Sequence, residues 1–461
     1  MKGRYLRILW ALLAVLVAGP SFAQIPAQTA APPPVQMPGN PPAQSPAAGP
    51  PPAAQSPQKL TLADAEKIAV QNHPQVQVAT ALAAAASAQV KEAQSAYYPM
   101  ANGSLTAAGA ENDSRIAAGA LNNPIVYDRY ANGVTVSQLV TDFGRTHNLV
   151  KSSNLHAKAA EENIVTSRAD VLLNVDRAYF SALKAQAVLQ VAEETVKSRQ
   201  LVADQVAALA QNQIKSGLDL SFAKVDLAQA QLLLIQAQND FQASQADLST
   251  ALGYPTPRAF ELTEEAVPGA PPVTVQDLIQ EAFRDRPELI GQRLDVSSAQ
   301  SYTTAERDLW FPTISGIGVA GLVPVRQDPL PSRYAAGGVN VNIPIFNGHL
   351  YGALRSEAQA QEQAQEQYLR DLQNRIARDV QTAWLNANSG YQRLSVTEQL
   401  LDQANLSLNL AQARYKLGLS SIIELSQAQL NQTQAQIADV AAKYDYATLI
   451  SALNYEVGAL K

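Results

Sequence analysis

LTLAD at residues 60–64 returns as VTVQD at residues 273–277, an offset of 213 positions along the chain. The same offset relates YYP at residues 97–99 to WFP at residues 310–312. Sequence similarity at a constant spacing indicates an internal duplication, in which each copy folds as the same structural unit. We therefore expect the fold of this chain to be that of one unit, present twice in tandem.

The spacing between the copies changes in one place only. GVTV at residues 133–136 matches GVNV at residues 338–341, so the offset has become 205, and it keeps this value to the end of each copy. The length difference of 213 − 205 = 8 residues falls between residues 99 and 133. Loops tolerate such changes and packed scaffolds do not, so we expect a loop in this interval.

Each copy begins with two predicted helices. Thr61 and Thr274 are suitable N-caps for the first helix, because an acidic residue follows at its third position (Asp64 and Asp277). The second helix follows a proline and ends at the aromatic pair and proline quoted above, since proline disfavours the helical conformation of the residue before it.

A β-hairpin is predicted next in each copy, at about residues 100–142 and about residues 313–347. Both segments are rich in Gly, Ser and Thr and alternate weakly between apolar and polar residues, which is typical of strands. The clearest strand has apolar residues at alternate positions, namely Val339, Val341, Ile343 and Ile345.

A very long helix follows each hairpin. Phe143 and Gln213 are separated by 70 positions, as are Gly348 and Gly418, and neither segment contains proline; as helix each would extend about 105 Å. A return helix rich in Ala and Gln follows in both copies. Helices of this length belong to a coiled coil or a helical barrel. An ordinary antiparallel coiled coil would explain the helices, but not the hairpin that interrupts each copy at the same place.

The composition excludes several classes of protein. The chain has 34 Lys and Arg against 40 Asp and Glu, a net charge of −6, so it offers no basic track for nucleic acid. It contains no cysteine, and hence no disulfide, no Cys-based metal site and no cysteine for an N-terminal lipid. The four histidines (His73, His147, His156 and His349) lack metal-ligand spacing and read as solvated surface residues. No catalytic motif is present, so we predict a non-enzymatic protein without cofactor or metal.

The N-terminal segments predict export. Residues 1–23 combine basic residues, a short apolar run and small residues before Gln24, which is typical of a cleaved signal peptide; a retained membrane anchor is the alternative. Residues 24–58 are rich in Pro and Ala and predict a disordered spacer. Repeat 1 then covers 59–253, a linker covers 254–272, and repeat 2 covers 273–461.

In this order and at this spacing, the motifs resemble those of the TolC-type outer membrane efflux protein family, from Leu60 to Gly458. The resemblance rests on the two helix starts, the aromatic-proline junctions, the hairpin exits TDFGR (141–145) and IFNG (345–348), and the turn YKLGL (415–419). It implies a mainly α fold with β-strands. Four strands per chain, twelve in a homotrimer, would form an outer-membrane β-barrel, continued by a long periplasmic α-helical barrel.

The resemblance also assigns roles to individual residues. Asp219, Tyr415 and Glu424 correspond to gate residues at the periplasmic tip, whereas Leu417, Gly418 and Leu419 match the turn that adaptors grip. Asn212, Gln213 and Ile214 fit that turn less well. For each acidic tip residue, a solvated turn residue is the competing interpretation. The aromatic residues of the junctions would lie at the membrane interface, unless they simply pack at a helix end: Tyr97, Tyr98, Trp310 and Phe311.

The tip departs from the family pattern at three positions. Ser420 occupies the place of an arginine of the family's ionic lock, and Gln427 that of a second pore-facing acid. Gln213 stands where a glycine is usual in the first-copy turn. A carboxylate–arginine lock should therefore not be assumed, and the closing mechanism of this tip is open at this stage.

The predicted function is that of an outer-membrane exit duct, extending into the periplasm, for a tripartite efflux or type I secretion system. Its expected partners are two further copies of the chain, a periplasmic adaptor protein, an inner-membrane transporter and outer-membrane lipid. A soluble periplasmic coiled-coil scaffold or adaptor is the alternative, although no β-rich adaptor domain is evident. The sequence leaves the cargo open.

Overall fold

The computed structural model describes residues 58–109, 129–325 and 331–460. The predicted signal peptide at 1–23 and all but the last residue of the predicted spacer at 24–58 lie outside the described residues, as do the connections within the two hairpins at 110–128 and 326–330.

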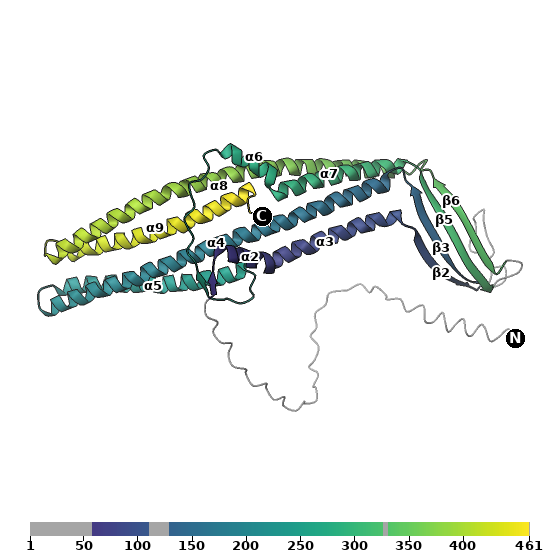
Figure 1. The fold of residues 1–461 in the computed structure, drawn as a ribbon. Coiled ribbons are helices and arrows are strands. Elements are labelled where there is room, and N and C mark those ends of the chain that lie inside the picture. The colour runs from purple at the N-terminus through teal and green to yellow at the C-terminus, as the bar shows by residue number, and fades with distance from the viewer. Residues whose placement is uncertain (1–57, 110–128, 326–330, 461) are drawn as a thin grey trace, which may run out of the picture. The chain divides into compact units, whose positions relative to one another are not determined.

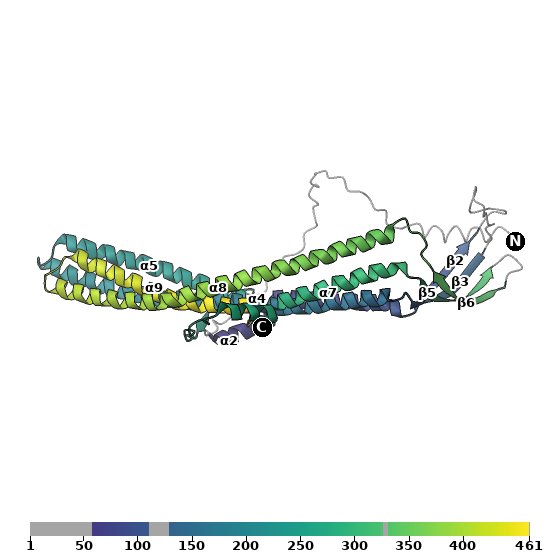
Figure 2. The same ribbon diagram turned by 90° about the horizontal axis from the view of Figure 1, so that it is seen from above.

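The two copies have the same order of elements (Figures 1 and 2). The first contains α2 (Leu62–Asn72), α3 (Pro74–Gln94), η1 (Ser95–Tyr97), β2 (Met100–Ala108), β3 (Arg129–Thr141), α4 (Arg145–Gln211) and α5 (Gly217–Ala251). The second contains α6 (Val275–Asp285), α7 (Pro287–Arg307), η2 (Asp308–Trp310), β5 (Thr313–Val325), β6 (Arg333–Asn342), α8 (Leu350–Lys416) and α9 (Ile422–Val457). The mainly helical fold with one four-stranded sheet is therefore confirmed.

The helix starts of the two copies differ in their caps. The Thr61 hydroxyl accepts a hydrogen bond from the backbone N–H of Asp64 (3.2 Å), as expected of an N-cap threonine. Thr274 occupies the corresponding N-cap position, but its side chain makes no capping hydrogen bond. The N-cap position predicted for Thr274 is confirmed, but the capping hydrogen bond is absent; the inner face of α6 is apolar, with Leu278, Ile279 and Ala282 buried.

The long helices α4 and α8 have 67 residues each. Each packs along its return helix, α5 or α9, and α4 also packs against α9, which joins the two copies. The helix contacts are rich in buried alanines, such as Ala203, Ala223, Ala411 and Ala428, which allow a close approach of the helix axes. In the described part of the chain, no helix is both long and apolar enough to span a membrane.

The four-stranded sheet is antiparallel in the order β2-β3-β5-β6. Pairing of β3 with β5 joins the hairpins of the two copies, with Val134 opposite Ala320. All residues of β6 are exposed, including Val339 and Val341. The strand ends at Asn342, so the prediction that Ile343 and Ile345 belong to it is wrong. Pro344 lies between them, has no N–H to donate, and so stops the ladder.

A second, two-stranded sheet was missed by the sequence analysis. β1 (Gln58–Leu60) pairs in parallel with β4 (Phe260–Leu262), which lies inside the predicted linker at 254–272. The fully buried Tyr179 of α4 contacts this sheet through its hydroxyl, which lies 3.0 Å from the carbonyl oxygen of Leu60 and 2.8 Å from that of Thr263. Three-residue strands carry no measurable periodicity, so only the tertiary pairing reveals them.

Candidate functional site

The first turn (residues 212–216) connects α4 to α5. Gln213 has φ +59°, the left-handed conformation in which glycine is favoured. Ser216 and Asp219 form a capping box: the Ser216 hydroxyl accepts the N–H of Asp219 (3.1 Å), and the Asp219 carboxylate accepts the N–H of Ser216 (3.2 Å). The predicted gate residue Asp219 is thus engaged in starting α5.

The second turn (residues 417–421) has the same geometry with different side chains. Gly418 has φ +71° in the position that corresponds to Gln213, and Ser421 caps α9 by accepting the N–H of Glu424 at 3.4 Å. The carboxylate of Glu424 lies 3.2 Å from Nε of Arg414, near the end of α8. Glu424 is therefore paired within its own hairpin rather than with the other one.

One contact joins the first turn directly to the last turn of α8. The ammonium group of Lys215, in the first turn, lies 4.1 Å from the centre of the Tyr415 ring, near the end of α8. Tyr415 is only 8% exposed, and its hydroxyl has no hydrogen-bond partner among the described residues. Burial raises the pKa of Tyr415, and the negative charge of Asp219 adds to this rise. The tyrosine therefore stays neutral, and its ring face is the group that Lys215 contacts.

A groove with a volume of about 550 Å³ lies between the ends of α4 and α8. Its rim includes Tyr415, Leu417 and Gly418 from the second copy, with Ile214 and Lys215 from the first. Leu417 and Leu419 are exposed, but Leu419 does not line the groove. The structure therefore brings together two of the three predicted docking residues with one predicted gate residue, and leaves Asp219, Glu424 and Leu419 outside this groove.

Sequence reasoning missed Lys215 and Arg414. The repeat offset contained a signal for the first of them, because 215 + 205 = 420 places Lys215 opposite Ser420, the position where the family pattern has an arginine. A cation absent from the second-copy turn is thus present at the corresponding position of the first-copy turn.

Polar contacts also join the two copies at the end of the groove farther from the turns. Arg199 of α4 is buried and donates from Nη2 to the carbonyl oxygen of Gln429 (2.7 Å) and to the hydroxyl of Thr433 (3.1 Å), both on α9. Burial lowers the pKa of Arg199, and the nearby Asp226 opposes this effect. The Ser426 hydroxyl donates to the Asp226 carboxylate of α5 at 2.5 Å. These contacts connect α9 to α4 and to α5 of the first copy.

The predicted membrane-interface aromatics lie where helix meets strand. Tyr97 ends the short helix η1, and Tyr98 follows it; Trp310 and Phe311 have the same positions around η2. All four are between 46% and 68% exposed. Trp310 also meets the Tyr351 ring edge-on, at 5.8 Å between centroids. The residues thus combine exposure with helix-end packing.

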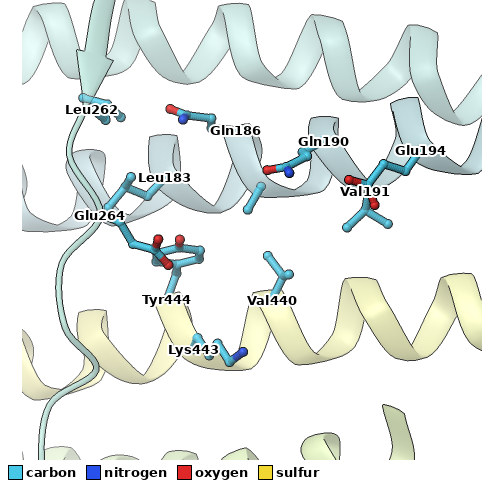
Figure 3. Close-up of a pocket in the computed structure, with 11 residues that line it drawn as sticks. Leu183, Gln186, Gln190, Val191, Glu194, Leu262, Glu264, Val440, Lys443 and Tyr444 are labelled. Atoms are coloured by element: carbon cyan, nitrogen blue, oxygen red, sulfur yellow. The ribbon is translucent and has the colours of Figure 1, made fainter. Parts of the chain in front are cut away.

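A second hollow, of about 330 Å³, lies between α4, α9 and the segment after β4 (Figure 3). It is lined by two carboxylates, Glu194 and Glu264, and by Lys443, which pairs with Asp439 of its own helix at 2.8 Å. The pKa of Tyr444 is raised by burial and by the adjacent Glu264. None of the predicted site residues lies in this hollow.

The described residues contain no group of three or more His, Asp or Glu side chains placed to hold a metal ion. Two histidines have structural partners: Nδ1 of His73 accepts the N–H of Gln75 at the start of α3 (3.2 Å), and Nδ1 of His156 lies 3.0 Å from the Asp295 carboxylate. Burial lowers the pKa of His73. The interpretation of these two as merely solvated histidines is therefore incomplete.

One buried carboxyl group has no counterpart in the second copy. Asp176 of α4 is 2% exposed, and the corresponding residue of α8 is Gln381. Burial raises the pKa of Asp176 to about 7; the Glu66 carboxylate adds to the rise and a hydrogen bond with Ser451 opposes it. The group therefore carries a proton well into the range where surface carboxylates are ionised.

Comparison with known proteins connects this arrangement to a family. The family profile described as "Outer membrane efflux protein" matches residues 67–254 and 278–458. The outer membrane protein TolC of Escherichia coli is 22% identical over 71% of this chain and 70% of its own length. The cation efflux system protein CusC of the same organism is 24% identical over 78% of both chains. The probable outer membrane lipoprotein SilC of Salmonella typhimurium is 25% identical over 68% of both.

Solved structures share the fold. A membrane protein from Pseudomonas aeruginosa has a TM-score of 0.75 at 21% identity, covering 86% of this chain and 93% of that one. A crystal structure of CusC has a TM-score of 0.74 at 20% identity, covering 91% and 99%. The outer membrane protein VceC of Vibrio cholerae has a TM-score of 0.72 at 18% identity, covering 86% and 96%.

Proposed function

The chain belongs to the outer membrane efflux protein family, and from that premise we propose that it is the outer-membrane exit duct of a tripartite efflux or type I secretion system. The proteins of this family are efflux channels and not enzymes. In this role the chain would conduct cargo passively from an inner-membrane transporter and a periplasmic adaptor to the outside.

The observation that carries the proposal is the four-stranded sheet at the start of the long helices. Its outer strands, β2 and β6, each have one edge without a partner strand among the described residues. An open edge in lipid would leave backbone groups without hydrogen bonds, so such a sheet must close with other copies. Three chains of four strands would close a twelve-stranded barrel.

The exposed apolar residues of the sheet support a lipid environment. Leu105 of β2 is 75% exposed, and Val339 of β6 is 73% exposed. The alternative, a soluble periplasmic coiled-coil scaffold or adaptor, would leave these side chains in water together with the exposed ring of Tyr98. In a barrel, the lipid-facing positions of the strands are apolar, and aromatic residues flank them.

The groove at the tip supports an adaptor as partner. It offers apolar side chains on a concave surface between the two helical hairpins, with Ile214 and Leu417 on its rim. A helical hairpin of an adaptor would lay its apolar face into this groove. Leu417, Gly418 and Leu419 would then form the docking surface, and Asp219, Tyr415 and Glu424 the gate.

Fractionation of cells producing the full-length tagged protein tests the duct against the scaffold. We expect recovery in the outer membrane, with a detergent extract that contains a trimer resistant to dissociation by mild heating in SDS. Release into the periplasmic fraction as a monomer or dimer would refute the barrel and favour the scaffold.

A further inference from the structure

We propose that the contact of Lys215 with the ring face of Tyr415 holds the first turn of each chain against the end of α8 and keeps the tip closed. This inference rests on the proposed function, because it names how the duct is regulated at that site. It gives the chain a cation–ring closure in the place of a carboxylate–arginine lock.

The acidic side chains of the tip are already engaged elsewhere. Asp219 belongs to the capping box with Ser216, and Glu424 pairs with Arg414 of its own hairpin. Within the described residues, no ion pair connects the first turn to the second. Lys215 is therefore the charged residue that links the first turn to the second hairpin, and its ammonium group lies 4.1 Å from the centre of the Tyr415 ring rather than at a carboxylate.

The state of Tyr415 fits this role. Its hydroxyl is buried without a partner in the described structure, so a hydrogen bond from this hydroxyl does not fasten the turns. The ring packs into an apolar cluster with Val206, Ile422 and Leu425. A half-buried cation over a well-packed ring gains more from the ring quadrupole than an exposed one does.

The polar contacts at the end of the groove farther from the turns limit which part of the two hairpins can separate. Arg199 binds the backbone of α9 at Gln429, and Asp226 binds Ser426, so the two hairpins are fastened at this level. Nearer the turns, the contact of Lys215 with the Tyr415 ring adds to the apolar packing around the open groove. Parting of the turns would thus begin with the loss of this contact, while the polar contacts above remain.

Single-channel recordings of the purified full-length protein in planar lipid bilayers test the proposal. Lys215→Met keeps the length of the side chain and removes its charge. Tyr415→Leu removes the ring, and Tyr415→Phe keeps the ring but removes the hydroxyl. Lys416→Met is the matched control, because Lys416 lines the same groove without contacting an aromatic ring in the described structure.

We expect Lys215→Met and Tyr415→Leu each to raise the ratio of open to closed states by roughly fivefold, the shift expected from losing one cation–π contact. The double variant should add little to either single one, since both remove the same contact. Lys416→Met should leave the ratio unchanged, and Tyr415→Phe, which keeps the ring face, should raise it much less than Tyr415→Leu does. An equal effect of Lys416→Met would show that charge alone matters, and opening by Tyr415→Phe as large as that by Tyr415→Leu would show that the hydroxyl is the closure; either result overturns the proposal.

A distance measurement separates this proposal from the proposed function. The chain has no cysteine, so spin labels at Asn212→Cys and Leu419→Cys report on the two turns alone. In trimers diluted with unlabelled chain, Lys215→Met should broaden the distance distribution and Lys416→Met should not. If the protein without these substitutions forms no channels, the duct is refuted, and the label distances still determine whether Lys215 holds the first turn against α8.

Discussion

At the junction between its two short helices, the first copy has His73, and the second copy has Arg286 in the corresponding position. His73 accepts a single N–H at the start of α3. Arg286 is buried and pairs with Glu456 (2.7 Å) and Glu288 (3.0 Å). One junction is thus held by a helix cap, and the other by a buried ion-pair network.

The backbone around both junctions is nevertheless the same. Gly253 and Gly458 follow the return helices with φ +81° and +86°, and a Cβ at either would lie within 3.2 Å of the junction backbone. Only glycine suits both the left-handed conformation and this close approach. The two copies therefore share the close backbone approach of a glycine to the junction, whereas the side chains that stabilise the junction differ between them.

The largest expected effect comes from breaking the second-copy junction. Arg286→Ala leaves Glu456 half-buried without its cation, and we expect a loss of about 3 kcal/mol in the free energy of unfolding. His73→Ala, the matched change in the first copy, removes one cap and should cost about 1 kcal/mol. Denaturant unfolding followed by circular dichroism measures both, and equal losses would contradict the contrast between the junctions.

Asp176→Asn should sharpen the contrast in a pH-dependent way, because it gives α4 an amide where α8 has Gln381. The folded state raises the pKa of Asp176 to about 7, so it binds the proton more tightly than the unfolded chain. The stability from this group is therefore present at low pH and is lost as pH rises from about 4 to about 7. We expect the variant to be more stable than the wild type at pH 8, where the buried carboxyl group of the wild type has lost its proton.

At pH 4 the same variant should match the wild type, since Asp176 is then protonated in the folded protein. Melting temperatures at the two pH values provide the measurement. A constant difference between variant and wild type across this range would show that the carboxyl group does not titrate as its burial implies.

The long helices α4 and α8 each contact the segment between the two copies, residues 254–272, through a different polar side chain. Tyr179→Phe leaves the carbonyl oxygen of Thr263 without this donor in a buried place and should cost about 1.5 kcal/mol. Trp384 of α8 donates from Nε1 to the Pro272 carbonyl oxygen (2.7 Å) at a more exposed site, so Trp384→Phe should cost about 0.5 kcal/mol. Thermal unfolding of the two variants compares them, and a larger loss for Trp384→Phe would reverse the expected order.

Small effects of opposite sign are expected at the turns. Gln213→Gly relieves a left-handed glutamine and should raise the free energy of unfolding by about 0.5 kcal/mol, whereas Gly418→Gln should lower it by about 1 kcal/mol. Urea unfolding of both variants provides the test. Destabilisation by Gln213→Gly would mean that the glutamine side chain makes a contact that outweighs its backbone strain.

Much of the backbone plan was predictable. The offset of 205 residues relates α4 to α8 at both ends, from Arg145 and Leu350 to Gln211 and Lys416, because proline-free runs between turn residues indicate uninterrupted helix. The last strand was predicted too long, since alternation at Ile343 and Ile345 continues past the point where Pro344 stops hydrogen bonding. Periodicity shows which residues could form a strand, but hydrogen bonding to the neighbouring strand determines where the strand ends.

The candidate site was predictable in position and not in its contacts. Tyr415, Leu417 and Gly418 were expected at a turn, and they lie at one. The lysine that contacts Tyr415 comes from a turn 200 residues earlier in the chain, and no local pattern reports which of several surface cations will meet a given ring. The assignment of Glu424 to the gate remains a prediction; its pairing with Arg414, across the turn between α8 and α9, had no signal in the sequence.

Local periodicity, proline placement and self-similarity were enough to predict the duplication, the order of the elements and the lengths of the long helices. Three contacts become evident in the folded chain alone: the pairing of β1 with β4, the packing of buried Arg199 against α9, and the position of Lys215 over the Tyr415 ring. Each of these joins residues far apart in the chain, and their contact depends on how the helices pack rather than on any preference of the residues themselves.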